Sequence, residues 1–162
     1  MKKILMAMMT VLLLAGCAEQ PVMETVADDL TEPAAVPVRQ IQVNLPDEAA
    51  VPTVEGSGGR IYLCEDYEIV IQTMAAGDLD ATVRALSGYD RQRLTVISTR
   101  PADVNRYDFV WATAGEEGDR LGRAVILDDG NYHYTMTVLR DADTTENSQI
   151  VWRSVFESFR LA

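Results

Sequence analysis

His133 is the only histidine in this 162-residue chain, so it is the only side chain that could serve as an imidazole base. It lies in a predicted strand between two tyrosines that point to the opposite face, so it shares a face with Thr135 and Thr137. An imidazole base needs a nucleophile and an orienting acid close by. Ser57 and Ser98 are candidate nucleophiles, but no motif surrounds either. A hydrolase that uses His133 with a serine is one hypothesis, and a surface or hydrogen-bonded structural histidine is the other.

Two short acidic turns contain carboxylates that could bind a hard cation such as calcium. The side chains concerned are Glu116, Glu117 and Asp119 in the first turn, and Asp128, Asp129 and Asn131 in the second. Calcium takes about six to eight oxygen ligands, and neither turn has the spacing of an EF-hand loop. Acidic residues beside glycine are also typical of hairpin turns, and carboxylates in one short turn do not flank a sugar ring as in a glycosidase. We expect no metal and no cofactor, and keep Glu116, Glu117 and Asp129 as candidate contacts for a ligand or partner.

The aromatic residues are better explained by a core than by a ligand cage. Tyr107, Phe109 and Trp111 share one face of a predicted strand, and Trp152 lies on a predicted helix. Trp111 is nevertheless a further candidate contact for a ligand. We expect that Trp111 and Trp152 can pack together where the helix meets the sheet.

Two other features carry weaker signals. The glycine-rich stretch Gly56–Gly59 precedes a strand, whereas phosphate-binding loops precede a helix, so it predicts a hairpin connection. Cys64 lies in an apolar predicted strand, which predicts a buried, inert thiol rather than a redox-active one.

The composition excludes several kinds of catalytic site. The only lysines are Lys2 and Lys3, so the rest of the chain has no P-loop lysine, Schiff-base lysine or Ser-Lys dyad. One histidine cannot form a zinc site of the two-histidine type. Because no complete catalytic set remains, the leading hypothesis is a binding or accessory module rather than an enzyme. Its expected partner is an envelope protein or a small ligand.

The first 17 residues predict where the protein is located. Lys2 and Lys3 precede an apolar run, Ile4–Leu14, and the small residues Ala15–Gly16 precede Cys17. Eleven helical residues span only about 17 Å, which is short of the ~30 Å hydrocarbon core. The segment resembles the lipobox signal of bacterial lipoproteins, which implies cleavage before Cys17 and a diacylglyceryl group on its thiol. The resemblance implies a lipid-anchored protein on the extracytoplasmic face. In a cell with two membranes, Ala18 after the cysteine resembles lipoproteins sorted to the outer membrane.

Residues 18–38 read as an acidic, proline-containing tether and residues 39–162 as one globular domain. Loss of the signal would leave 12 arginines against 25 acidic residues, a formal charge of −13. A chain with this much negative charge is a poor partner for nucleic acid. Anionic lipid also repels it, so the lipid on Cys17 must hold the protein at the bilayer. Lipidation would also leave Cys64 without a disulfide partner.

The periodicity of the domain predicts an α+β fold with an antiparallel sheet of about six to seven strands and two helices. Hairpin turns are predicted at Gly115–Gly118 and at Asp129–Gly130. The predicted strands lie in Ile41–Leu45, Arg60–Cys64, Tyr67–Gln72, Leu94–Thr99, Tyr107–Ala114, Leu121–Leu127 and Tyr132–Leu139.

Two helices accompany these strands. Asp78 is the predicted N-cap of the first helix, and Gly88 is the residue that ends it. The second helix is predicted to begin near Thr144 or Thr145 and to end near Phe159. One face of it, which should pack against the sheet, carries Trp152, Val155, Phe156 and Phe159.

The order of elements resembles the PsbP-like α/β sandwich, in which a terminal helix packs across an antiparallel sheet. The stretches that carry this resemblance are Tyr132–Val138 and Ser158–Arg160. The chain also resembles a group of uncharacterised bacterial lipoproteins in Ile61–Cys64, Gly115–Asp119 and Ile126–Tyr134. The first resemblance implies an accessory or binding role at a membrane, and neither implies a known activity.

Overall fold

The computed structural model describes residues 36–115, 118–142 and 146–162. Val36–Ala162 forms one compact unit. The predicted lipobox with Cys17, the tether up to residue 35, Glu116, Glu117 and the predicted helix start at Thr144 or Thr145 lie outside the described residues.

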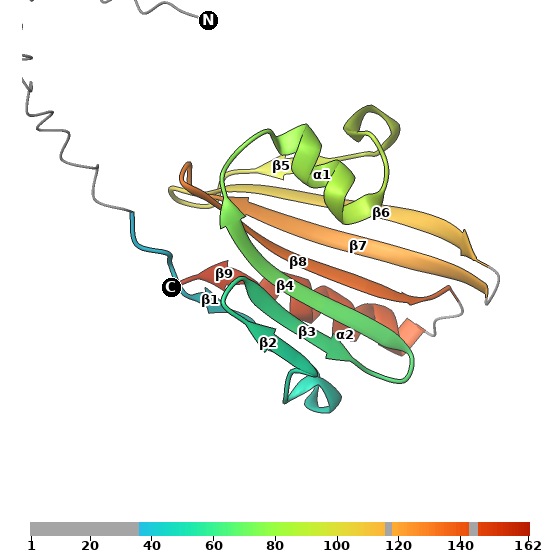
Figure 1. Ribbon diagram of the computed structural model, residues 1–162. Helices are drawn as coiled ribbons and strands as arrows, with labels where there is room; N and C mark the ends of the chain where they lie inside the picture. Colours follow the sequence, from blue (N-terminus) through green and yellow to red (C-terminus); the bar gives the residue numbers. More distant parts are fainter. Residues whose placement is uncertain (1–35, 116–117, 143–145) are drawn as a thin grey trace, which may run out of the picture. The chain divides into compact units, whose positions relative to one another are not determined.

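A seven-stranded antiparallel sheet is the centre of the domain (Figure 1). Its spatial order is β2-β3-β4-β8-β7-β6-β5, and every neighbouring pair is antiparallel. The strands are β2 (Val54–Gly56), β3 (Gly59–Leu63), β4 (Tyr67–Ala75), β5 (Ile97–Thr99), β6 (Asn105–Gly115), β7 (Gly118–Asp128) and β8 (Tyr132–Asp141). With its two α-helices, this sheet confirms the predicted α+β class.

Tight turns connect the central strands as predicted. The pair Gly115–Gly118 closes the β6–β7 hairpin, and Gly56–Gly59 closes the β2–β3 hairpin. At the β7–β8 turn the Asp129 carboxylate accepts the backbone N–H groups of Asn131 and Tyr132, at 2.9 and 2.8 Å. These contacts fix the register of the three long strands β6, β7 and β8.

The first helix, α1 (Leu79–Ser87), begins and ends where the sequence predicts. The Asp78 side chain accepts the N–H of Asp80 at 3.0 Å, and Gly88 adopts the left-handed conformation with φ of 77°. The buried Val83 packs on the sheet among Phe109, Trp111, Ala124 and Ile126. We call this face of the sheet the α1 face.

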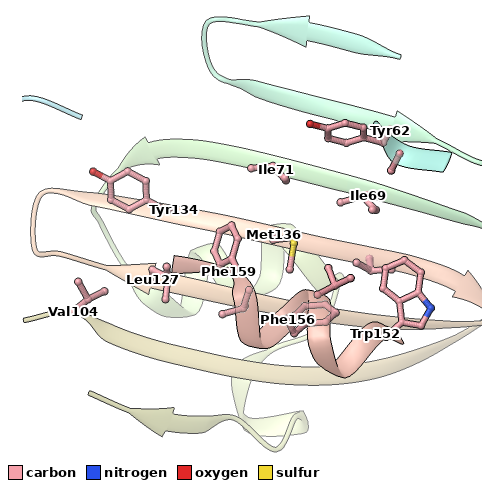
Figure 2. Packing of buried hydrophobic residues seen from close by; sticks show 14 residues of the cluster. Tyr62, Ile69, Ile71, Val104, Leu127, Tyr134, Met136, Trp152, Phe156 and Phe159 are labelled. Atoms are coloured by element: carbon pink, nitrogen blue, oxygen red, sulfur yellow. The ribbon is translucent and has the colours of Figure 1, made fainter. Parts of the chain in front are cut away.

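The second helix, α2 (Glu146–Ser158), covers the opposite face, here called the α2 face. All four residues of its predicted apolar side, Trp152, Val155, Phe156 and Phe159, are buried there. Figure 2 shows these aromatic side chains beside Met136 and other core residues of the sheet. The predicted helix is therefore confirmed over Glu146–Ser158.

Several predicted strands are shorter than expected. The first, β1 (Ile41–Gln42), pairs with an unpredicted C-terminal strand, β9 (Arg160–Leu161), in a separate two-stranded sheet. The 3₁₀ turn η1 (Asp47–Ala49) follows β1, and another, η2 (Arg91–Arg93), precedes β5. Residues 94–96 belong to no strand, although Leu94 and Val96 still pack on the α1 face.

The expected contact between the two tryptophans is wrong. Trp111 lies in the cluster on the α1 face, with its ring centroid 5.7 Å from that of Phe109. Trp152 lies in the cluster on the α2 face and meets Tyr67 edge-on, with ring centroids 4.8 Å apart. Both tryptophans are core residues, as predicted, but they belong to opposite sides of the sheet.

Candidate functional site

The structure buries His133 between the sheet and α1, with only 2% of its surface exposed. Its Nδ1 lies 2.9 Å from the hydroxyl of Thr82, a residue of α1, and its Nε2 lies 4.0 Å from the Asp128 carboxylate. The Thr82 hydroxyl is also 3.4 Å from the carbonyl oxygen of Asp78, so it bridges the helix start and the imidazole. His133 therefore joins α1 to the sheet.

This arrangement contains a hydroxyl, an imidazole and a carboxylate in sequence, but the hydroxyl is not one of the predicted serines. Ser57 lies in the β2–β3 turn and Ser98 in β5, and the described contacts of His133 are with Thr82 and Asp128. Thr82 is itself buried. A buried threonine hydroxyl held by the carbonyl of its own helix start has no route to a substrate, so the geometry favours the structural role.

The second acidic turn uses its carboxylates within the fold. Besides the two backbone N–H groups, Asp129 accepts the Tyr134 hydroxyl at 3.0 Å, and that hydroxyl accepts the backbone N–H of Arg39 at 2.9 Å. Burial raises the pKa of Asp129, but the hydrogen bonds from Asn131, Tyr132 and Tyr134 outweigh it and leave that pKa below its usual value. The carboxylate of Asp129 is thus a structural acceptor.

No group of three or more metal-ligating side chains occurs among the residues that the structure describes. At the second turn, Asp128 accepts the N–H of Gly130 at 2.8 Å.

Of the other candidates, Trp111 is 7% exposed and lies over Gly122 within the core. Cys64 is half-buried, with its Sγ 3.8 Å from the carbonyl oxygen of Glu48.

A hollow on the α2 face was not predicted from the sequence. It has a volume of about 830 Å³ and lies on the α2 face, between the β5–β6 loop and the end of α2. Five arginines line it: Arg39, Arg100, Arg106, Arg123 and Arg160. Three acidic residues share the lining, namely Asp103, Asp108 and Glu157. We call this site the arginine hollow; its lining carries an excess of positive charge in a chain whose formal charge is −11.

Arg106 forms the fixed inner wall of the arginine hollow. Its guanidinium makes a bidentate pair with Asp108, at 2.7 and 3.1 Å. It also donates to the carbonyl oxygens of Phe156 and Phe159, at 2.9 and 3.1 Å. These carbonyls belong to the end of α2, where backbone acceptors lack partners within the helix. Arg106 is therefore a helix cap, and its donors are occupied within the fold.

Other arginines of the hollow are more exposed than Arg106. Arg100 is exposed on the β5–β6 loop, and Arg160 is exposed on β9, where its Nε donates to Gln42 at 3.1 Å. Arg39 pairs with the exposed Asp103 at 3.2 Å. Ala102, next to Arg100 and Asp103 in the lining, has a φ of 56°, which is uncommon for a residue with a side chain.

A second hollow, of about 560 Å³, lies on the same face beside the middle of α2. Arg123, which also lines the arginine hollow, joins Arg140 and Arg153 in its wall. Burial and the positive charge of Arg123 lower the pKa of Arg140. We call this site the Trp152 hollow, after the buried tryptophan in its wall. Together the two hollows include seven of the 12 arginines.

These sites have no local sequence signal because their residues are far apart along the chain. The arginine hollow is assembled from the segments 39, 97–108, 123–127 and 157–161. The only available hint was compositional, namely that every basic residue after Lys3 is an arginine. Arginine forms planar, bidentate contacts with carboxylate and phosphate groups.

Comparison with protein-family models finds no match, and no curated protein matches the chain. Within the described residues, neither α-helix has the length and apolar character needed to cross a bilayer. The functional argument therefore rests on the geometry of the domain.

Proposed function

We propose that this protein is a lipid-anchored, extracytoplasmic binding module without enzymatic activity, and that it binds an anionic ligand in the arginine hollow. The observation that carries the proposal is the gathering of five arginines around one hollow of an acidic chain. Guanidinium groups bind carboxylates and phosphates through charge-assisted hydrogen bonds. The volume of about 830 Å³ is within the range of small-molecule sites.

The lining also indicates what the rest of the ligand is like. Ile97 is 61% exposed at the hollow, and Pro101 and Leu161 contribute further apolar surface. Arg100 and Arg160 approach from different segments of the chain. A ligand with an anionic group and an apolar body would satisfy both parts of this lining, because burial of apolar area adds to the charged contacts.

The anchor and the fold family belong to the same proposal. We assign Cys17 as the lipidated residue and the segment after it as a tether that holds the domain near the bilayer. We also propose a PsbP-like sandwich, supported by the antiparallel sheet and by the C-terminal helix across one face. An accessory role at a membrane fits a domain with a binding hollow.

The binding proposal is tested by calorimetric titration of the full chain, held in detergent micelles, with octyl phosphate. We expect binding that is at least about tenfold weaker in the double variant Arg100→Ala/Arg160→Ala, since hydrogen bonds to charged groups contribute ~1.5–3 kcal/mol. Arg84→Ala/Arg93→Ala, which removes the same charge on the α1 side, is the control and should bind as the parent does. An equal loss of affinity for octyl phosphate in both double variants would show that only the net charge matters. It would refute binding in the arginine hollow.

Two further probes identify the source of the anionic group. Inorganic phosphate tests the charged part alone, and unilamellar vesicles containing an anionic phospholipid test a bilayer head group. Binding of octyl phosphate but not of vesicles supports a monomeric ligand, whereas vesicle binding that depends on Arg100 and Arg160 supports a lipid head group.

A further inference from the structure

The sheet has an open edge next to the Trp152 hollow. The edge strand β5 has three residues and pairs only with Arg106, Tyr107 and Asp108 of β6. The strand β6 continues to Gly115, and within the described residues its remaining part, 109–115, has β7 as its only strand partner. A long strand edge without a partner is a template for pairing with another chain.

The hairpin register shows which backbone groups face this open edge. A two-residue loop is closed by a hydrogen-bonded pair, here Gly115–Gly118, and such pairs alternate with non-hydrogen-bonded pairs along the ladder. Val110, Ala112 and Ala114 therefore direct their N–H and C=O groups away from β7. The Tyr89 hydroxyl, which donates to the Ala112 carbonyl at 2.9 Å, independently confirms this direction for Ala112.

The side chains along this edge leave room for another strand. Val110, Ala112 and Ala114 are all exposed, and Val110 has 61% of its surface accessible. They are small and point to the α2 face, the face of the Trp152 hollow. The occupied Ala112 carbonyl is no obstacle, since a carbonyl oxygen can accept two hydrogen bonds.

The charge beside the edge selects the partner. Arg153, exposed on α2, lines the Trp152 hollow. Arg123, the direct cross-strand neighbour of Val110, lines it too and also lies 3.6 Å from the Asp108 carboxylate. The lining of the Trp152 hollow contains three arginines and no acidic residue among the described residues. Side chains of an added strand that point to the α2 face would meet this positive surface, so acidic side chains are favoured there.

We propose that an extended acidic segment of a partner protein adds to the sheet as a strand along residues 109–115 of β6. Its backbone would pair with Val110, Ala112 and Ala114, and its acidic side chains would point toward Arg123 and Arg153. This mode combines main-chain hydrogen bonds, which supply affinity, with charged contacts, which supply specificity. The proposal goes beyond ligand binding in the arginine hollow and does not require it.

A second copy of the chain is a weaker candidate for the same edge. Symmetric pairing of β6 with its own copy would bring the arginine-lined hollows of both copies to one interface, and like charges facing each other oppose association. Self-association is therefore an outcome of the test rather than the proposal.

The test uses a synthetic peptide of about eight residues that alternates glutamate and valine, a length suited to one strand. The full chain in detergent micelles is titrated with it while amide hydrogen exchange is followed by NMR. We expect exchange at the N–H groups of Val110, Ala112 and Ala114 to slow by at least about tenfold at saturation. A peptide alternating lysine and valine should not bind.

A third peptide separates strand addition from simple charge attraction. It has the glutamate–valine sequence with its alternate, edge-facing amides N-methylated, so its charge is unchanged while its ladder donors are lost. We expect no measurable binding. Equal binding of the methylated and unmethylated peptides, or binding without slowed exchange at the three β6 amides, would overturn the proposal.

Matched variants place the site on the protein. Val110→Glu should weaken peptide binding by at least about tenfold, because it sets a carboxylate against the acidic strand. Val51→Glu, at another exposed valine, is its control and should leave binding unchanged. Slowed exchange at the same amides without peptide, together with concentration-dependent sedimentation, would show that a second copy occupies the edge and would also overturn the proposal.

Discussion

The Arg106 side chain links the sheet directly to the end of α2. One guanidinium satisfies both oxygens of Asp108 and the carbonyls of Phe156 and Phe159. It is also little exposed, at 16% of its side chain. Arg106 therefore contributes mainly to the stability of the folded domain. By holding the end of α2 in place, it also maintains the shape of the arginine hollow.

Arg106→Ala is expected to lower the free energy of unfolding by about 2–4 kcal/mol, because it removes the bidentate partner of a half-buried carboxylate and a charged donor to two helix-end carbonyls. Asp108 would then keep only Arg123, at 3.6 Å. Urea denaturation of the variant and the parent measures the difference. Arg93→Ala is the control, since that guanidinium lies over the Tyr89 ring at the surface, and should cost less than about 1 kcal/mol. Similar losses in the two variants would contradict the capping role.

Asp129→Asn tests the carboxylate that orders the β7–β8 turn. Its pKa is lowered in the folded state, so its stabilisation is present above the unfolded value of about 3.9 and is lost as the pH falls through the folded pKa. We expect the variant to be less stable by about 1 kcal/mol at pH 7. The gap should close below about pH 4, as measured by thermal unfolding across pH. A gap that stays constant with pH would argue against a charge effect.

Residue types alone did not determine the chemical role of individual side chains. The shared face of His133 and Thr135 was readable from the strand period, but its contact with Thr82 depends on where α1 packs. The role of Asp129 as a turn acceptor follows from a common local pattern, so the sequence offered it as an alternative. The contribution of Arg100 and Arg160 to one hollow depends on tertiary convergence and had no sequence signal.

The packing of β6 on β7 depends on a glycine. A Cβ on Gly122 would lie within overlap distance of the Trp111 indole, so only a hydrogen fits there. The pairing of these two residues across the strands fixes the indole over the sheet and under α1. The close approach explains why the tryptophan is buried on this face.

Gly122→Ala should destabilise the domain by about 1–3 kcal/mol, the usual effect of overpacking a core position. The matched control is Gly58→Ala, where a Cβ would meet no atom within 4 Å and a change of less than about 0.5 kcal/mol is expected. Chemical denaturation of both variants, with near-ultraviolet circular dichroism to follow the Trp111 environment, makes the comparison. An unchanged Gly122→Ala variant would mean that the indole can move without cost.

Local elements were predictable where the signal itself is local. The N-cap at Asp78, the left-handed Gly88 and the turn at Asp129–Gly130 all occur as expected. Elements with distant partners were not predictable in this way. The strand β1 forms only where β9 pairs with it, nearly 120 residues later in the chain. The side of the sheet that each helix covers is also a tertiary property, which is why the expected contact of Trp111 with Trp152 was wrong.

The charge of the whole molecule bears on the proposed lipid anchor. Apart from Lys2 and Lys3, the chain carries 12 arginines against 25 acidic residues, and seven of those arginines line hollows rather than a continuous basic face. An anionic bilayer would repel such a protein without a lipid. Under the proposed anchoring, membrane attachment would therefore depend on one residue, Cys17.

Cys17→Ser is expected to release a folded, soluble domain or to leave an uncleaved precursor, because the lipid cannot be attached. Membrane fractions washed with high salt, together with mass measurement of the N-terminal peptide, distinguish these outcomes from an anchored protein. Cys64→Ser, which alters a half-buried thiol within the domain, is the control and should remain in the membrane fraction. A Cys17→Ser protein that is still processed and salt-resistant in the membrane would refute the assignment.

The pairing of β1 with β9 has a consequence for biosynthesis. Ile41 lies opposite Leu161, and the N–H of Ala162 donates to the Gln40 carbonyl at 2.8 Å. The first strand of the domain therefore has no partner until the last residues have left the ribosome, and closing so long a loop is slow compared with local hairpin formation. A nascent chain of this protein stays incompletely folded until Arg160 and Leu161 have been made, and incompletely folded chains are the state that a translocation channel for unfolded polypeptides requires.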